Sequence, residues 1–177
     1  MKKIVSILLA CLVLFCLAGC KSNDGAPDGM KLASSPDLVP YSLYVPESWV
    51  IDDNNSSTRA HVSSIDTSSV SVGDYGYATV DEWWEAYKTA LSSVSGFEIL
   101  EEGVAGIVDG QASKSYTYKT VQATILGAEN VAYKHYATAT MHNGLVYVIL
   151  FTSYEGQLFD NNITVVKNDI IANFKFN

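Results

Sequence analysis

The chain has 177 residues, of which 48% are hydrophobic and 17% charged, and its formal net charge is −8. This length indicates one ordinary domain with room for a tail. The hydrophobic fraction is that of a globular protein, so disorder throughout the chain is excluded. The sequence pI of about 4.7 argues against a nucleic-acid partner, because binding to phosphates needs clustered Lys and Arg.

The amino-terminal residues have the pattern of a secretion signal. Lys2 and Lys3 precede a run without charge at residues 4–18. As a helix, about 15 residues reach only about 22 Å, whereas the hydrocarbon core of a bilayer is roughly 30 Å thick. The run therefore predicts the apolar part of a signal peptide rather than a membrane span.

The signal ends in Leu17-Ala18-Gly19-Cys20, which resembles the lipobox of bacterial lipoproteins. This resemblance implies a signal peptide over residues 1–19, cut before Cys20, and a diacylglyceryl group on the Cys20 thiol. Two acyl chains hold a protein on a bilayer stably, whereas one binds marginally. We therefore expect a lipid-anchored protein on the extracytoplasmic face of a bacterial cell membrane. The alternative is an ordinary signal peptide that happens to contain a cysteine.

All three cysteines of the chain, Cys11, Cys16 and Cys20, lie in this segment. The rest of the chain has no thiol for a disulfide, a zinc ribbon or a cysteine nucleophile. These three classes of protein are therefore excluded.

The residues after the lipobox are predicted to be a tether. Residues 21–40 are mostly small, polar and turn-forming, with no helical or strand period, as in a flexible linker. Residues 20–40 are thus expected to be the lipidated cysteine and its tether, with a lower half able to dock through Leu38 and Val39. The folded domain is expected at residues 41–177.

The first half of that domain is predicted to hold three short strands, an apolar patch and one helix. The strands fall at residues 42–45, 59–65 and 69–72, and the apolar patch falls at residues 49–51. Thr79-Val80-Asp81-Glu82 is a capping box, in which the Thr hydroxyl accepts from a free N–H and the Glu reaches back. The helix is expected to end at Gly96 and to face the core with residues spaced by three and four, namely Val80, Trp84, Tyr87, Leu91 and Val94.

The second half is predicted to be a run of hairpins closed by a helix. Asp109-Gly110 and Asn143-Gly144 are strong turn signals, because type I′ turns need positive φ at both central positions. The strand at 145–151 is apolar on both faces, so it is expected at the centre of the sheet with cover on each side. Further strands are predicted at residues 97–100, 104–108, 115–121 and 131–141, then a helix through Phe159, Ile163, Val166, Ile170 and Phe174, and a short edge strand at 174–176.

These elements make the expected fold class α+β, with an antiparallel sheet of about seven strands flanked by helices. The opening Tyr41-Ser42-Leu43-Tyr44-Val45-Pro46-Glu47-Ser48-Trp49 resembles the start of PsbP-like domains. Asp109-Gly110 before a Tyr-rich strand, a long apolar hairpin and a terminal helix ending Phe-x-Phe follow in the order of that family. The resemblance covers residues 41–177 and implies an α/β/α sandwich with accessory or binding work rather than catalysis. The metal-binding positions described for some members of that family cannot be matched to residues here, so the resemblance implies no metal.

No pattern of a catalytic or metal-binding set occurs in the sequence. His61, His135 and His142 form neither His-x-x-x-His nor His-Glu-x-x-His, so ordinary strand or surface roles are expected of them. The chain also lacks a Gly-x-Ser-x-Gly elbow and a glycine loop for phosphate. We therefore predict no cofactor, no metal and no catalytic residue.

Acidic residues come in pairs at Asp52-Asp53, Asp81-Glu82 and Glu101-Glu102. The two glutamates are neighbours on a strand, so they are expected to point to opposite faces, and Asp81-Glu82 suits the start of a helix. The loop at Asp52-Asp53-Asn54-Asn55 lacks the ligand spacing of an EF-hand, so a solvated loop is expected rather than a Ca²⁺ site. The alternative function is an envelope-acting hydrolase or transferase with Asp52, Asp53 or Glu101 as acid and base.

Aromatic residues are the one surplus of the composition, with 11 Tyr, 6 Phe and 3 Trp. Most fall on predicted core positions. Tyr75 and Tyr77 lie in a loop flanked by glycine, and Trp83 lies beside the core face of the helix, so these three are predicted to form an exposed patch. The expected function is a non-catalytic binding or accessory module for an envelope protein or a small ligand.

Overall fold

The computed structural model describes the chain at residues 25–34, 37–52, 58–64, 68–123 and 130–177. The predicted signal peptide, Cys20 and the stretch Asp53-Asn54-Asn55 lie outside the described residues. The elements in chain order are β1 (Met30–Leu32), β2 (Tyr41–Ser42), β3 (Tyr44–Pro46), β4 (Val50–Ile51), β5 (Arg59–His61), β6 (Ser69–Tyr75), α2 (Val80–Leu91), β7 (Glu98–Val108), β8 (Gln111–Ala123), β9 (Asn130–His142), β10 (Leu145–Tyr154), α3 (Gln157–Val165), the π-helix η1 (Val166–Ile171) and β11 (Lys175–Phe176).

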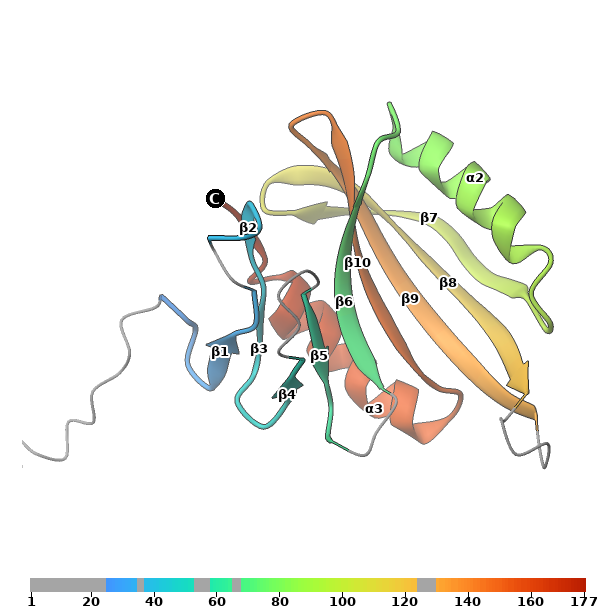
Figure 1. Ribbon diagram of the computed structural model, residues 1–177, viewed down its shortest axis with the longest axis horizontal. Helices are drawn as coiled ribbons and strands as arrows, with labels where there is room; N and C mark the ends of the chain where they lie inside the picture. The colour runs from blue at the N-terminus through green and yellow to red at the C-terminus, as the bar shows by residue number, and fades with distance from the viewer. Residues whose placement is uncertain (1–24, 35–36, 53–57, 65–67, 124–129) are drawn as a thin grey trace, which may run out of the picture.

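One antiparallel sheet organises the fold. Its seven strands run in the order β4-β5-β6-β10-β9-β8-β7, and the two-stranded pairs β1-β3 and β11-β2 lie beside it. Helix α2 packs on one face of the sheet, whereas α3, η1 and the short strand pairs pack on the other (Figure 1). The predicted class, an α+β fold with a seven-stranded antiparallel sheet between helices, is confirmed.

Strand β10 lies at the centre of this sheet, as its apolar character on both faces predicts. Val146 and Val148 pack in the core under α2, whereas Tyr147, Ile149 and Phe151 pack in the core under α3 and η1. Side chains alternate between the two faces of a strand, so a strand covered on both sides must be apolar throughout. Two hydrophobic cores therefore meet back to back along β10.

Both predicted hairpin turns are present. Asp109 and Gly110 have φ of 45° and 75°, and Asn143 and Gly144 have φ of 47° and 79°. These are the positive values that a type I′ turn requires, and Asp, Asn and Gly adopt them more readily than other residues. The turns join β7 to β8 and β9 to β10, so the four longest strands form a continuous meander.

Helix α2 begins at the predicted capping box. The Thr79 hydroxyl accepts from the Glu82 N–H at 3.1 Å, and the Glu82 carboxylate accepts from the Ala78 N–H at 3.2 Å. The helix ends at Leu91 rather than at Gly96, because turns take over before that glycine, whose φ is 65°. The capping box thus fixes the first turn of the helix just after the end of β6.

The folded body begins before residue 41. Met30 pairs with Pro46, which makes Met30–Leu32 a strand inside the range predicted as a tether. Met30 is buried in the α3-side core, and Val39 packs against that core, whereas Leu38 is exposed. The prediction that residues 30–32 have no strand structure is therefore wrong, and the physical reason is their pairing with β3.

Two further elements differ from their predicted bounds. The strands predicted at 97–100 and 104–108 are one strand, β7, whose pairing with β8 shifts between Ile99 and Val104. Gly103, with φ of 69°, lies within this β-bulge. The terminal helix changes from α to π at Val166, and Val166 and Ile170 in the π-helical part are buried.

Candidate functional site

A recess opens on the α2 face of the sheet, between α2 and the strands β5 and β6. Its floor comes from β9 and β10, including Val148 and Leu150, and its walls come from Tyr75 of β6 and Trp83 of α2. Arg59 of β5 is exposed and completes the lining. The volume of the recess is about 170 Å³. It therefore combines an apolar floor, aromatic walls and one cationic group.

The Tyr75 ring lies close to Gly73 of its own strand. A Cβ atom added at Gly73 would lie 2.9 Å from the Tyr75 hydroxyl oxygen and 3.2 Å from two ring carbons. Only glycine two residues earlier leaves room for this ring. Burial raises the pKa of Tyr75 above its usual 10.0, and the nearby Tyr87 and Asp74 raise it further. The phenol is thus a neutral hydroxyl at physiological pH, with 39% of the residue exposed.

Trp83 is buried, with 2% of its surface exposed, so the prediction that it belongs to an exposed patch is wrong. Its ring lies 6.0 Å from that of Tyr75 and is stacked on Tyr87 at 5.2 Å. The apolar stripe of a helix is wide enough to include positions at both +3 and +4 from Val80. Trp83 and Trp84 therefore both face the sheet, and Trp83 supports the recess from behind.

Tyr77, the third residue of the predicted patch, is 36% exposed but does not line the recess. It lies in the turn between β6 and α2, where its N–H donates to the Tyr75 carbonyl at 3.0 Å. The structure thus brings Tyr75 and Trp83 together at the recess and leaves Tyr77 outside. The residues that the sequence pattern did not single out, Arg59 and Gly73, come from strands whose pairing is visible only in three dimensions.

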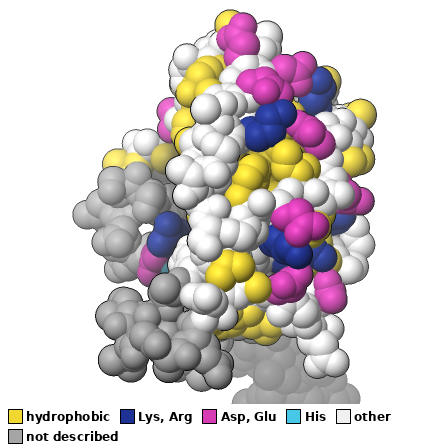
Figure 2. Space-filling view, turned by 90° about the vertical axis from the view of Figure 1, so that its right-hand side faces the viewer, with side chains coloured by type: hydrophobic (Ala, Val, Ile, Leu, Met, Phe, Trp, Pro, Cys, Tyr) yellow, Lys and Arg dark blue, Asp and Glu magenta, His cyan; other side chains and the backbone are white. Residues whose placement is uncertain are grey.

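Figure 2 looks onto the side of the molecule that carries α2 and shows hydrophobic side chains between acidic and basic ones. Lys88 pairs with Glu85 at 2.7 Å and with Glu102 at 2.9 Å, and the Trp84 indole N–H also donates to Glu102. The hydrogen bonds from Lys88 and Trp84 lower the pKa of Glu102. This carboxylate is held ionised as a structural acceptor and is not poised as an acid.

Of the carboxylates named for the alternative acid–base function, Asp52 and Glu101 are not brought together, and Asp53 lies outside the described residues. Asp52 directly follows β4 and Glu101 lies on β7, the two opposite edges of the seven-stranded sheet. Six strand spacings of about 4.8 Å each separate β4 from β7 across the sheet, so Asp52 and Glu101 lie far apart. Asp52 instead contacts His61 at 3.0 Å, and Glu101 accepts from the Thr117 hydroxyl at 3.1 Å. Glu101 and Glu102 do point to opposite faces, as predicted.

Within the described part of the chain, no group of three or more His, Cys, Asp and Glu residues is arranged to hold a metal ion. His135 is buried on β9, where its ring is stacked on Tyr118 at 4.6 Å and lies 2.9 Å from the hydroxyls of Thr120 and Thr152. Burial lowers the pKa of His135 to about 4. This histidine is a neutral core residue.

No helix among the residues that the structure describes is long and apolar enough to cross a membrane. Neither a family model nor a curated protein matches the chain.

Solved structures do resemble it. Cyanobacterial PsbP from Synechocystis sp. PCC 6803 aligns over 91% of this chain and 99% of its own, with 16% identity and a TM-score of 0.59. The chain has the PsbP-like fold. The PsbP-like fold also appears in the Ran-binding protein Mog1p from Saccharomyces cerevisiae, which aligns over 83% of this chain and 95% of its own, with 11% identity and a TM-score of 0.52.

A third structure with this likeness is PA94 from Pseudomonas aeruginosa, a protein of unknown function and putative regulator. It aligns over 78% of this chain and 91% of its own, with 14% identity and a TM-score of 0.51. At such low identities the likeness establishes the fold alone. Function must therefore be argued from the residues of this chain.

Proposed function

We propose that the protein is a lipoprotein held on the extracytoplasmic face of the cell membrane through Cys20, and that its PsbP-like domain is a non-catalytic module that docks another protein at the recess. The anchor is supported by Lys2 and Lys3, the apolar run and the Leu17-Ala18-Gly19-Cys20 motif. A net charge of −8 repels anionic lipid, so acyl chains rather than surface charge must hold the body at the membrane.

The observation that carries the docking proposal is the half-exposed Tyr75, laid over Gly73 and backed by the buried Trp83. Rigid, partly exposed aromatic rings beside an apolar floor are typical of the residues that dominate protein interfaces. Their position is set by packing before any partner arrives, which lowers the entropic cost of binding.

The size of the recess favours a protein partner over a small ligand. Pockets that enclose drug-sized ligands usually have about 300–1,000 Å³, whereas this recess has about 170 Å³. That is room for one apolar or aromatic side chain from a partner surface. Arg59, the cationic residue of the lining, would pair with a carboxylate beside that side chain. The Ran-binding Mog1p supports a protein partner for this fold.

Affinity capture from native membranes tests the docking proposal. Tyr75→Ala and Arg59→Glu should each lose a protein that the wild type retains, whereas Tyr77→Ala should retain it. Tyr77 is the matched control, because it is the same residue type with similar exposure, two residues away and outside the recess. Equal capture by all four proteins would refute the recess as the docking site.

Cell fractionation tests the anchor. Cys20→Ala should move the protein out of the membrane fraction and abolish labelling by a radioactive fatty acid, because the proposal places the lipid on the Cys20 thiol. Cys16→Ala is the control and should leave both unchanged, since Cys16 lies within the signal peptide that is removed. A Cys20→Ala protein that stays in the membrane would overturn the anchor.

A further inference from the structure

Three rows of residues, here called rungs, cross the sheet from β10 to β7 on the face that packs against α3. Along each rung the type of side chain changes from strand to strand. Residues opposite each other in antiparallel strands share a face. On β10 the three rungs hold Phe151, Ile149 and Tyr147, which are buried in the core on that face. Across β9, β8 and β7 they continue as Tyr136-Thr117-Glu101, Thr138-Ser115-Val104 and Thr140-Ser113-Gly106. Hydroxyl-bearing side chains therefore occupy all three rungs on β9 and β8.

These hydroxyls do not form an ordinary exposed surface, because most of them are buried. Thr138 and Thr140 are 4% and 2% exposed. The Thr140 hydroxyl donates to the Ala112 carbonyl at 2.9 Å. The Thr138 hydroxyl oxygen, in contrast, is buried and has no hydrogen-bond partner among the described residues. A desolvated hydroxyl without a protein partner lowers stability, and a ligand hydroxyl that reached Thr138 from above the sheet would remove that cost.

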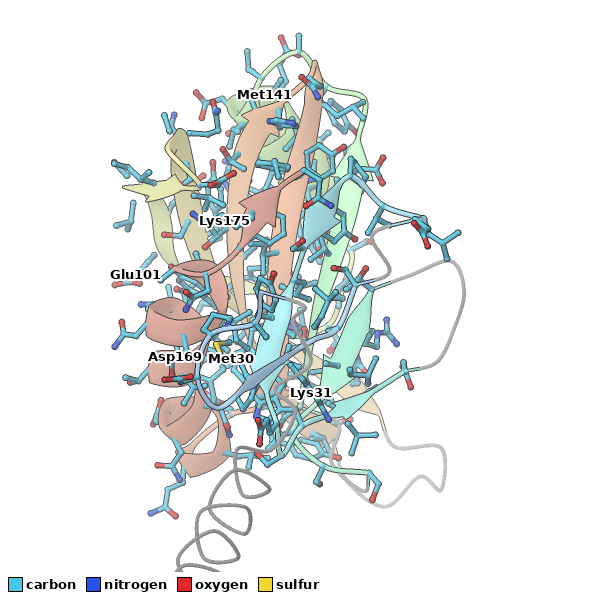
Figure 3. All side chains as sticks on the ribbon, turned by 90° about the vertical axis from the view of Figure 1, so that its left-hand side faces the viewer. Met30, Lys31, Glu101, Met141, Asp169 and Lys175 are labelled. Atoms are coloured by element: carbon cyan, nitrogen blue, oxygen red, sulfur yellow. The ribbon has the colours of Figure 1, made fainter. Side chains whose placement is uncertain are left out.

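A hollow of about 290 Å³ lies over these rungs. Thr138 and Tyr136 line it from β9, Lys167 from η1, and Glu101 and Val104 from β7. The Lys167 ammonium nitrogen stands 4.6 Å from the centre of the Tyr136 ring. Figure 3 shows Glu101 on β7 beside the terminal helix that carries Asp169, so the hollow lies between this helix and β7.

We propose that this hollow binds one neutral sugar ring of an envelope glycan. A sugar presents hydroxyls that both donate and accept, which matches the serine and threonine hydroxyls of the lining. Its C–H face needs an apolar contact, which the exposed Val104 provides. The volume is near the lower end of the range for small-ligand pockets, about 300 Å³, as a single ring requires.

Charge selects a neutral ring over an ionic ligand. Lys167 and Glu101 line the hollow from opposite sides with opposite charges, so neither an anion nor a cation meets a site of complementary net charge. Both groups are able to hydrogen-bond sugar hydroxyls. Gly106 leaves room for the Ser113 hydroxyl at the next rung, since a Cβ atom there would lie 3.1 Å from the Ser113 hydroxyl oxygen.

The test is a titration monitored by ¹⁵N–¹H correlation spectra. The full chain is purified in a phosphocholine detergent that carries no sugar. Glucose and N-acetylglucosamine are the probes, and inorganic phosphate is the ionic comparison. The wild type should show saturable shifts at the amides of residues 104–106, 113–115 and 138 with at least one of the two sugars. Phosphate should produce none at these positions.

Thr138→Val should weaken the sugar about tenfold, which corresponds to ~1.4 kcal/mol, while its melting temperature is equal to or above that of the wild type. Gly106→Leu should remove binding by filling the hollow. Thr140→Val is the matched control and should keep the affinity, because its hydroxyl is already used by Ala112. Absence of shifts in the wild type, or an unchanged affinity in both Thr138→Val and Gly106→Leu, would overturn the proposal. The recess lies on the other face of the sheet, so this result is independent of the docking test.

Discussion

Buried His135 should make the stability of the domain fall as the pH drops below 6.5. The residue is 8% exposed, and its two ring nitrogens lie 2.9 Å from threonine hydroxyls that serve equally as donors or acceptors. Its neutral form is therefore fully hydrogen-bonded. Burial is the cause of the fall in its pKa from 6.5 to about 4, because the charged form loses its hydration.

The size and sign of the effect follow from linkage. Above pH 6.5 the imidazole is neutral in both the folded and the unfolded chain, so the full stability is present. As the pH falls toward 4, the unfolded chain binds a proton that the folded chain does not, and stability is lost. At 1.36 kcal/mol per pKa unit the total loss is about 3 kcal/mol, of which about 2 kcal/mol falls between pH 7.5 and 5.

Urea unfolding of the wild type and His135→Gln at pH 7.5 and pH 5 measures how much of the pH dependence of the free energy of unfolding comes from His135. Glutamine keeps a donor and an acceptor for the threonines but does not titrate, so the variant should lose about 2 kcal/mol less over this interval. His142→Gln is the comparison variant, in which an imidazole outside the buried core is replaced in the same way. Carboxylates such as Glu102 titrate equally in all three proteins and cancel. An identical pH dependence in the wild type and His135→Gln would refute the reasoning.

Three further predictions concern stability. Trp84→Ala should lower the free energy of unfolding by about 3–5 kcal/mol, because Trp84 is 2% exposed and stacked on Tyr116 at 4.1 Å; an unchanged urea midpoint would contradict this packing. Thr79→Ala should cost about 1 kcal/mol through the lost helix cap, whereas Thr79→Ser should restore the wild-type midpoint. Asp109→Asn should speed hydrogen exchange of the Phe176 amide, which donates to the Asp109 carboxylate at 2.9 Å, while the positive φ of the turn is kept; unaltered exchange would show that this carboxylate does not hold β11.

Local signals in the sequence predicted the fold well. The capping box at Thr79, the turns at Asp109-Gly110 and Asn143-Gly144, and the two-sided apolar strand β10 each depend on residues close in sequence. All of them are present. The opening Tyr41–Trp49 pattern likewise indicated the PsbP-like fold that the structural comparison shows.

Features that depend on pairing between distant segments could not be predicted in this way. β1 has only three residues, and its order comes from pairing with β3. Trp83 was assigned to the surface because a helical period alone does not say how wide a stripe the sheet covers. The unpartnered hydroxyl of Thr138 is visible only once the register aligns β7, β8 and β9.

Some residues of the recess could be predicted from their neighbours in the sequence, whereas others reach it only through strand pairing. Tyr75 was singled out from its glycine-flanked sequence, and the role of Gly73 beneath its ring follows from the strand geometry. Arg59 reaches the recess because β5 pairs with β6, where Arg59 lies opposite Ser71. The sequences of β5 and β6 contain no pattern that predicts this pairing of Arg59 with Ser71.

Site-specific photo-cross-linking in intact cells tests the docking proposal most directly. A photoreactive phenylalanine replaces Tyr75 in one strain and Tyr77 in another, and the adducts are compared by mass spectrometry. The account predicts that position 75 yields one protein adduct in the membrane fraction, that position 77 does not, and that Arg59→Glu abolishes the adduct. Equal adducts from both positions, or none from position 75, would contradict a protein-docking site at the recess.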